Sequence, residues 1–168
     1  MKPIATVLAM CILAAPVTAQ DGAGTITGTL DLKPARWIVA GAGDEPTSGW
    51  AETDTGTEIR LVGTPDAQGD GGPGTLTLKM DVETGAVAAR VSEVEVTLQR
   101  SDETWVSNSE TIDLTLEAFQ PSGNDVVVAG SFVTTVFADS VEGLAADSGK
   151  GLTIDGNFQA TVPKASAP

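Results

Sequence analysis

The chain contains no histidine and no tyrosine, and its only cysteine lies at position 11. Histidine is the usual acid–base group near neutral pH, and thiolates are strong nucleophiles and metal ligands. The same side chains supply most ligand sets of zinc, copper and haem iron. No glycine-rich phosphate loop or serine-nucleophile motif is present either. The sequence therefore predicts a protein that is not an enzyme, with hydrolysis by paired carboxylates as the enzymatic alternative.

Basic residues are also scarce. Nine Lys and Arg residues stand against 23 Asp and Glu residues, for a formal net charge of −14. A field of this sign repels the phosphate backbone of nucleic acids and the surface of anionic membranes. Nucleic acid is therefore excluded as a partner, and the charge is explained by solubility in an exposed compartment.

No apolar run is long enough to cross a bilayer, which needs about 20 residues. Lys2 precedes an uncharged, mostly apolar stretch over residues 4–15, and small residues follow as far as Ala19. This pattern predicts a cleaved secretory signal peptide over residues 1–19, with Cys11 discarded as part of it. We expect export to a periplasm or to the exterior, and no membrane insertion once the leader is removed.

The remaining sequence is dominated by alternation of apolar and polar residues with a period of two, which is typical of strands with one buried face. Five segments show it most clearly: residues 25–32, 75–82, 93–99, 112–117 and 152–162. Three further segments are predicted strands: residues 35–40, 58–62 and 125–137.

These segments predict an all-β fold, an antiparallel two-sheet sandwich of about eight or nine strands. A closed β-barrel is the alternative, because periodicity does not separate the two. At most one short helix is expected, over residues 138–147. We expect a single domain over residues 20–163 and a flexible tail over residues 164–168.

The pattern changes at two places in the first third of the chain. The first segment places Leu32 on its buried face, and the buried positions change from even to odd at Lys33–Pro34. A bulge or corner at that proline would produce such a change. The stretch from Gly41 to Gly56 contains no alternation and is predicted to be a long loop.

Trp50 lies in that predicted loop, close to Glu52 and Asp54. An exposed indole ring can stack on a sugar or another small ligand while the carboxylates accept hydrogen bonds from hydroxyl groups. Alternatively, Trp50 folds back and fills one open end of the sandwich, because an aromatic side chain buries a large apolar area.

Calcium is the one ion that this composition can bind, because calcium takes oxygen ligands alone. Asp66 and Asp70 lie among glycines and are the candidate ligands, although the spacing matches no known calcium loop. The alternative is that both aspartates serve as ordinary turn residues. No other cofactor is expected.

The segment 125–137 is apolar on both faces. Phe132 and Val136 occupy one face, and Val133 and Phe137 occupy the other. This pattern is typical of a central strand covered on both sides, or of a strand whose second face meets another chain. The four residues are therefore a candidate interaction face for an envelope or secreted protein, or for self-association.

No motif is specific enough to indicate a family. The function that the sequence predicts is that of an exported, non-catalytic binding or protein-interaction module. Ligand binding at Trp50 and stabilisation by calcium are the alternatives.

Overall fold

The computed structural model describes residues 23–41, 47–66, 72–84, 88–101, 103–107, 111–138 and 151–165. The predicted signal peptide and residues 139–147 of the predicted helix lie outside these ranges. Within them, no helix has the length and apolar character needed to cross a bilayer.

Ten strands account for most of the described residues. They are β1 (Gly24–Leu30), β2 (Lys33–Val39), β3 (Gly49–Glu52), β4 (Thr57–Pro65), β5 (Thr75–Thr84), β6 (Ala89–Arg100), β7 (Glu103–Ser107), β8 (Asp113–Ser122), β9 (Asp125–Ala138) and β10 (Leu152–Pro163). Every pairing between them is antiparallel. The predicted antiparallel all-β fold is confirmed. The strand β3 was not predicted, because it is short and lies inside the glycine-rich stretch Gly41–Gly56.

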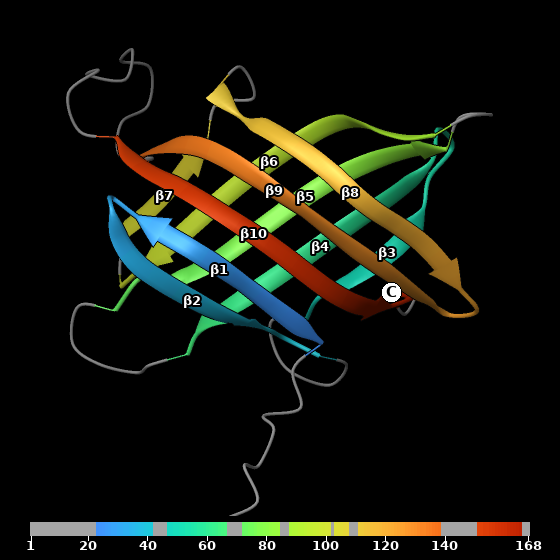
Figure 1. The fold of residues 1–168 in the computed structure, drawn as a ribbon, viewed down its shortest axis with the longest axis horizontal. Helices are drawn as coiled ribbons and strands as arrows, with labels where there is room; N and C mark the ends of the chain where they lie inside the picture. The colour runs from blue at the N-terminus through green and yellow to red at the C-terminus, as the bar shows by residue number, and fades with distance from the viewer. Residues whose placement is uncertain are drawn as a thin grey trace, which may run out of the picture.

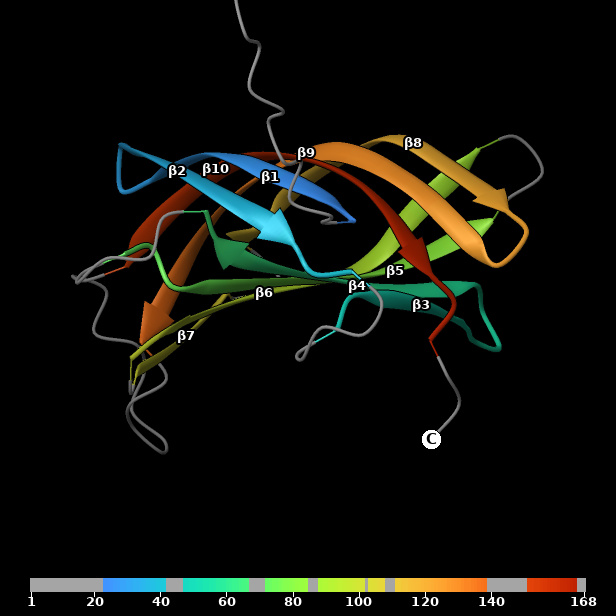
Figure 2. The same cartoon turned by 90° about the horizontal axis from the view of Figure 1, so that it is seen from below.

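The strand pairings run in a closed circuit. From β9 they pass through β10, β1, β2, β4, β5, β6 and β7 and return to β9. β8 extends β9 beside the β7 contact, and β3 pairs with β4. Two layers cross with the core between them: β1, β2, β8, β9 and β10 form one, and β3 to β7 form the other (Figures 1 and 2). The closed circuit is a feature of a barrel and the two facing layers are a feature of a sandwich, so the fold combines elements of both predicted architectures.

Side chains from both layers fill the interior. Phe132 of β9 and Phe158 of β10 meet there, with ring centroids 6.4 Å apart. Each ring lies over a glycine of the neighbouring strand, because the register sets Phe132 opposite Gly156 and Phe158 opposite Gly130. A Cβ atom on Gly130 would lie 2.8 Å from the Phe158 ring. The two glycines thus provide the room that the two rings occupy.

The turn between β1 and β2 consists of Asp31 and Leu32. Both residues have positive φ, 51° and 65°, as in a two-residue type I′ hairpin turn. The predicted change of buried positions at Lys33–Pro34 is confirmed, and its cause is this turn rather than a bulge. Leu32 was predicted to be buried, but it lies at the tip and is 88% exposed. That prediction is wrong because β1 already ends at Leu30.

Candidate ligand-binding site

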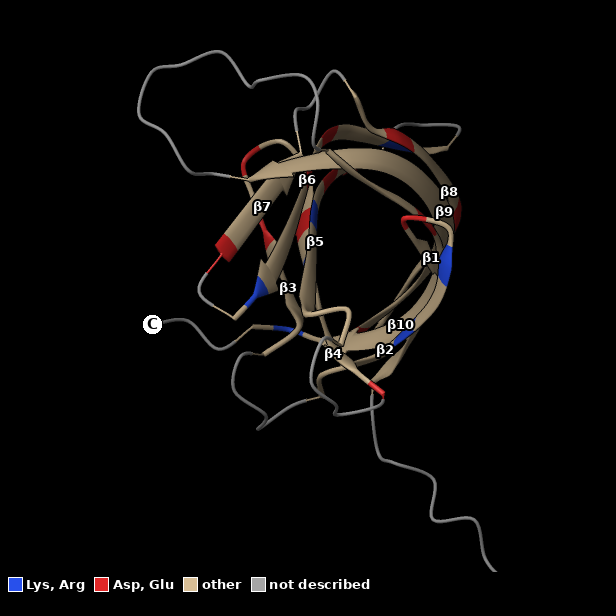
Figure 3. Cartoon of the chain, turned by 90° about the vertical axis from the view of Figure 1, so that its left-hand side faces the viewer, with Lys and Arg blue, Asp and Glu red and all other residues tan. Residues whose placement is uncertain are grey.

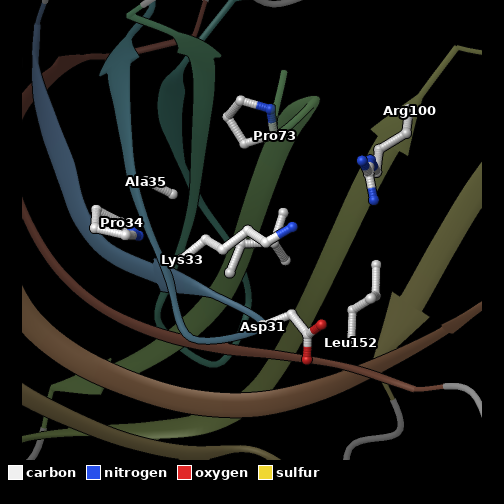
Figure 4. Close-up of a pocket in the computed structure, with 8 residues that line it drawn as sticks. Asp31, Lys33, Pro34, Ala35, Pro73, Arg100 and Leu152 are labelled. Atoms are coloured by element: carbon white, nitrogen blue, oxygen red, sulfur yellow. The ribbon is translucent and has the colours of Figure 1, made fainter. Parts of the chain in front are cut away.

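A pocket of about 210 Å³ opens at the end of the molecule that carries the β1–β2 turn. We call it the end pocket, and Figure 3 views the molecule from this end. The apolar part of its lining comes from Leu30, Pro34, Ala35, Pro73 and Leu152, and the charged part comes from Asp31, Lys33 and Arg100 (Figure 4).

The lining is assembled from four segments that are distant in the sequence: the β1–β2 turn, the approach to β5, the end of β6 and the start of β10. The backbone N–H of Asp31 donates to the carbonyl of Thr153 at 2.8 Å, which ties the turn to β10. The buried indole of Trp37 donates through Nε1 to the carbonyl of Gly74 at 2.8 Å, which fixes the segment before β5. These two hydrogen bonds therefore fix the turn and the segment before β5, which form part of the pocket lining.

Gly74 positions Arg100. Gly74 has a φ of +87°, in the region that favours glycine. A Cβ atom at this position would lie 2.6 Å from Cγ of Arg100, so the aliphatic stem of the arginine lies against the glycine backbone. Gly74 therefore allows both the turn before β5 and the close approach of the Arg100 side chain.

Two cationic side chains face each other across the end pocket. Lys33 extends toward Arg100, with its ammonium group on the side of the guanidinium (Figure 4). Within the part of the chain that the structure describes, the salt bridges are Arg36–Asp66, Lys79–Glu58 and Lys164–Glu52, and neither Lys33 nor Arg100 takes part in one. Like charges repel, so this arrangement favours an anion between them.

The turn at the rim of the end pocket combines a left-handed backbone with an exposed apolar side chain, both at Leu32. Leu32 lies between the lining residues Asp31 and Lys33, with its side chain almost wholly in water. Its left-handed backbone costs an ordinary residue about 1–2 kcal/mol, because Cβ approaches the following carbonyl oxygen. Strained backbone is tolerated where the surrounding structure enforces it, and it concentrates at ligand-binding sites.

The structure places Trp50 in the interior. Trp50 belongs to β3, is 7% exposed and donates through Nε1 to the carbonyl of Asn124 at 3.0 Å. Lys164 lies over its ring, with Nζ 4.9 Å from the centroid. The prediction of an exposed stacking ring is therefore corrected, because the Trp50 side chain folds back and is buried.

The carboxylates near Trp50 do not form a ligand site with it. Glu52 binds Lys164, with Oε1 3.0 Å from Nζ, and Asp54 is exposed between β3 and β4. Lys164 and Ala165 are also held by the backbone, because Ala165 donates to the carbonyl of Trp50 at 2.7 Å. The predicted flexible tail is therefore corrected for these two residues, and residues 166–168 lie outside the described ranges.

The structure describes one of the two predicted calcium ligands. Asp66 faces Arg36, with a closest oxygen–nitrogen distance of 3.6 Å, and Asp70 lies outside the described residues. Over the described ranges, no three His, Cys, Asp or Glu side chains gather as a metal site requires. Calcium binding stays a prediction from composition.

The four residues of the predicted interaction face lie on opposite faces of β9, because side chains alternate along a strand. Phe132 and Val136 are 1% and 0% exposed and belong to the core, so the prediction is corrected for these two. Val133 is 46% exposed and Phe137 is half-buried, on the opposite face. The strand itself is central, with β10 along one edge and β8 and β7 along the other.

Comparison with known protein families, with curated proteins and with solved structures finds no match to this chain. The assignment of the end pocket as a candidate site therefore rests on the geometry of this structure alone. Sequence reasoning did not single out Lys33 and Arg100. The signal that could have identified them is the scarcity of basic residues, which makes each Lys or Arg at a strand end worth examining.

Proposed function

We propose that this chain is an exported, non-catalytic binding module whose ligand occupies the end pocket. One observation carries the proposal: Lys33 and Arg100, which form no ion pair within the described residues, line one pocket together with the left-handed turn residue Asp31. The two like charges repel each other across the pocket, and an anionic group that binds between them offsets that repulsion. Small-ligand sites combine apolar side chains with convergent polar groups, and the end pocket is lined by both kinds.

Two properties of the sequence support the proposal that the chain is non-catalytic and exported. The absence of histidine, and of any cysteine after position 11, removes the commonest groups for proton transfer and nucleophilic attack. The leader pattern of residues 1–19 supports export.

A screen of small molecules tests the proposal. The amides of Lys33, Gly74 and Arg100 are to be followed by proton–nitrogen correlation NMR on residues 20–168, with panels of small acids, amines and sugars. We expect at least one class to shift these amides saturably, and every bound compound to be recovered chemically unchanged. Shifts that cluster elsewhere, or conversion of a bound compound, would contradict the proposal.

Export is tested separately by expressing the full chain with its leader. We expect the protein in the extracytoplasmic fraction, with a mass that corresponds to an N-terminus at Gln20. Retention of the uncleaved chain in the cytoplasm would show that the leader reading is incorrect.

A further inference from the structure

We infer that the end pocket takes a small aliphatic carboxylic acid, with its carboxylate between Lys33 and Arg100 and its hydrocarbon body against the apolar lining. This inference rests on the proposed function and specifies the class of ligand.

The charge of the pocket selects a monoanion. Lys33 and Arg100 contribute two positive charges and Asp31 contributes one negative charge, which leaves a single excess positive charge. A carboxylate neutralises it, whereas a dianion such as phosphate would leave an excess negative charge beside Asp31. The chain as a whole, with a net charge of −14, penalises a second negative charge further.

The shape of the cationic groups favours a carboxylate among monoanions. A guanidinium group is planar and offers parallel N–H donors that match the two oxygens of a carboxylate. The ammonium of Lys33 extends toward the same space from the opposite side (Figure 4). The stem of Arg100 lies against Gly74, so the side chain leaves β6 on the side of the pocket.

The apolar lining and the volume set the size of the body. Leu30 is 8% exposed and lies deep, while Pro34 and Leu152 are more accessible. A volume of about 210 Å³ has room for a small ligand. We therefore take a chain of about six carbons as the body of the probe.

Hexanoate is the probe that tests the inference, with hexanol and hexylamine as uncharged and cationic analogues of similar length. Inorganic phosphate is the dianion. Binding is followed by the NMR shifts of Lys33, Gly74 and Arg100 at constant ionic strength. We expect hexanoate to bind in roughly the millimolar range, as a ligand of this size allows. We expect hexanol and hexylamine to bind at least tenfold more weakly.

Charge-neutralising variants identify the cations. Arg100→Gln and Lys33→Gln should each weaken hexanoate binding about threefold to fivefold, the range for a solvent-accessible ion pair. Arg60→Gln is the matched control, because Arg60 is exposed on β4 and outside the pocket, and it should leave the dissociation constant unchanged. Circular dichroism checks that each variant is folded.

The outcomes separate the inference from the proposed function. Equal binding of hexanol or hexylamine at the pocket amides, or tighter binding of phosphate, would overturn the carboxylate assignment and leave the pocket as a binding site. An equal effect of Arg60→Gln and Arg100→Gln would also overturn it. No shift at the pocket amides with any of the four probes, followed by none from the wider panels, would overturn both proposals.

Discussion

Single residues determine where this chain is stable and where it is strained. Trp50 shows the favourable case: its ring is buried, its N–H is bonded to the carbonyl of Asn124, and the Lys164 ammonium lies over its face. Leu32 shows the opposite case, because its backbone is left-handed and its side chain is in water. A cation over an indole contributes about 0.5–1 kcal/mol at an accessible site, which is comparable with the backbone strain at Leu32 and opposite in sign.

The strain at Leu32 gives the first residue-scale prediction. Leu32→Gly removes the Cβ clash at a φ of 65° and produces Asp-Gly, a favoured type I′ pair. After the entropy cost of glycine is subtracted, we expect a gain of about 0.5–1 kcal/mol in the free energy of unfolding. Urea denaturation measures it. Leu32→Ala is the control, because it keeps Cβ, and it should gain less. A glycine variant no more stable than the alanine variant would show that the backbone is not strained.

At the scale of elements, the β4–β5 pairing sets like charges opposite each other. Glu58 faces Asp81, and Arg60 faces Lys79. The compensation is diagonal: Nζ of Lys79 lies 2.9 Å from a carboxylate oxygen of Glu58. The hydrogen bond to Glu58 and its charge raise the pKa of Lys79 above the ordinary value of 10.5. Lys79 therefore interacts with three nearby carboxylates, those of Glu58, Asp81 and Glu95.

This arrangement predicts a pH-dependent effect of Lys79→Gln. Because the pKa of Lys79 is raised in the folded state, its stabilising contribution is complete below pH 10.5 and is lost as the pH rises through the raised value. We expect the variant to lose at most about 1 kcal/mol at neutral pH, since the pair is solvent-exposed. The loss should shrink toward zero as the pH rises through the raised pKa of Lys79. Urea midpoints of wild type and variant across this range measure it.

Arg60→Gln is the control for that prediction. It removes a cation that faces Lys79 directly, so the free energy of unfolding should stay the same or rise slightly. A Lys79→Gln defect that is unchanged at high pH, or that is matched by Arg60→Gln, would mean that the pairing with Glu58 is not its cause.

Much of the strand content was predictable from the sequence, because alternation with a period of two follows directly from the geometry of a pleated strand. The segment 152–162 shows it best, since Ile154, Phe158, Ala160 and Val162 are all buried in β10. The β1–β2 turn was missed because leucine at a left-handed position contradicts the usual turn residues. The strand β3 was missed because its four residues are too few to show a period.

The end pocket was not predictable, because it exists only at the scale of the whole molecule. Lys33 and Arg100 are far apart in the sequence, and the closed circuit of pairings brings the ends of β2 and β6 to the same side. Leu152 joins them from β10, near the other end of the chain. A sequence pattern reports which face of a strand is buried, but it does not report which strand ends meet.

The closed circuit contains two short links, β2–β4 and β7–β9, each of three residue pairs among the described residues. β9 pairs with β10 along the whole range Asp125–Val136, whereas the described part of β7 pairs with β9 through residues 105–107. We expect hydrogen exchange to be slowest for amides in β9 and β10 and clearly faster in β7, because local opening there breaks few bonds. Equal protection in β7 and β10 would mean that the circuit opens only by global unfolding.

Ser107 strengthens the neighbouring β6–β7 link of the circuit, and this link allows a direct test. Its hydroxyl oxygen accepts a hydrogen bond from the buried Val96 N–H at 2.8 Å, which links β7 to β6 beyond their last backbone pair. Ser107→Ala leaves that N–H without its acceptor, at a cost of about 1 kcal/mol. Exchange of the β7 amides should therefore accelerate about fivefold, while the β10 amides change less. Ser92→Ala is the matched control, because its hydroxyl makes only an exposed bond of 3.3 Å to the carbonyl of Asp81. If both variants accelerate β7 equally, Ser107 does not hold the circuit closed.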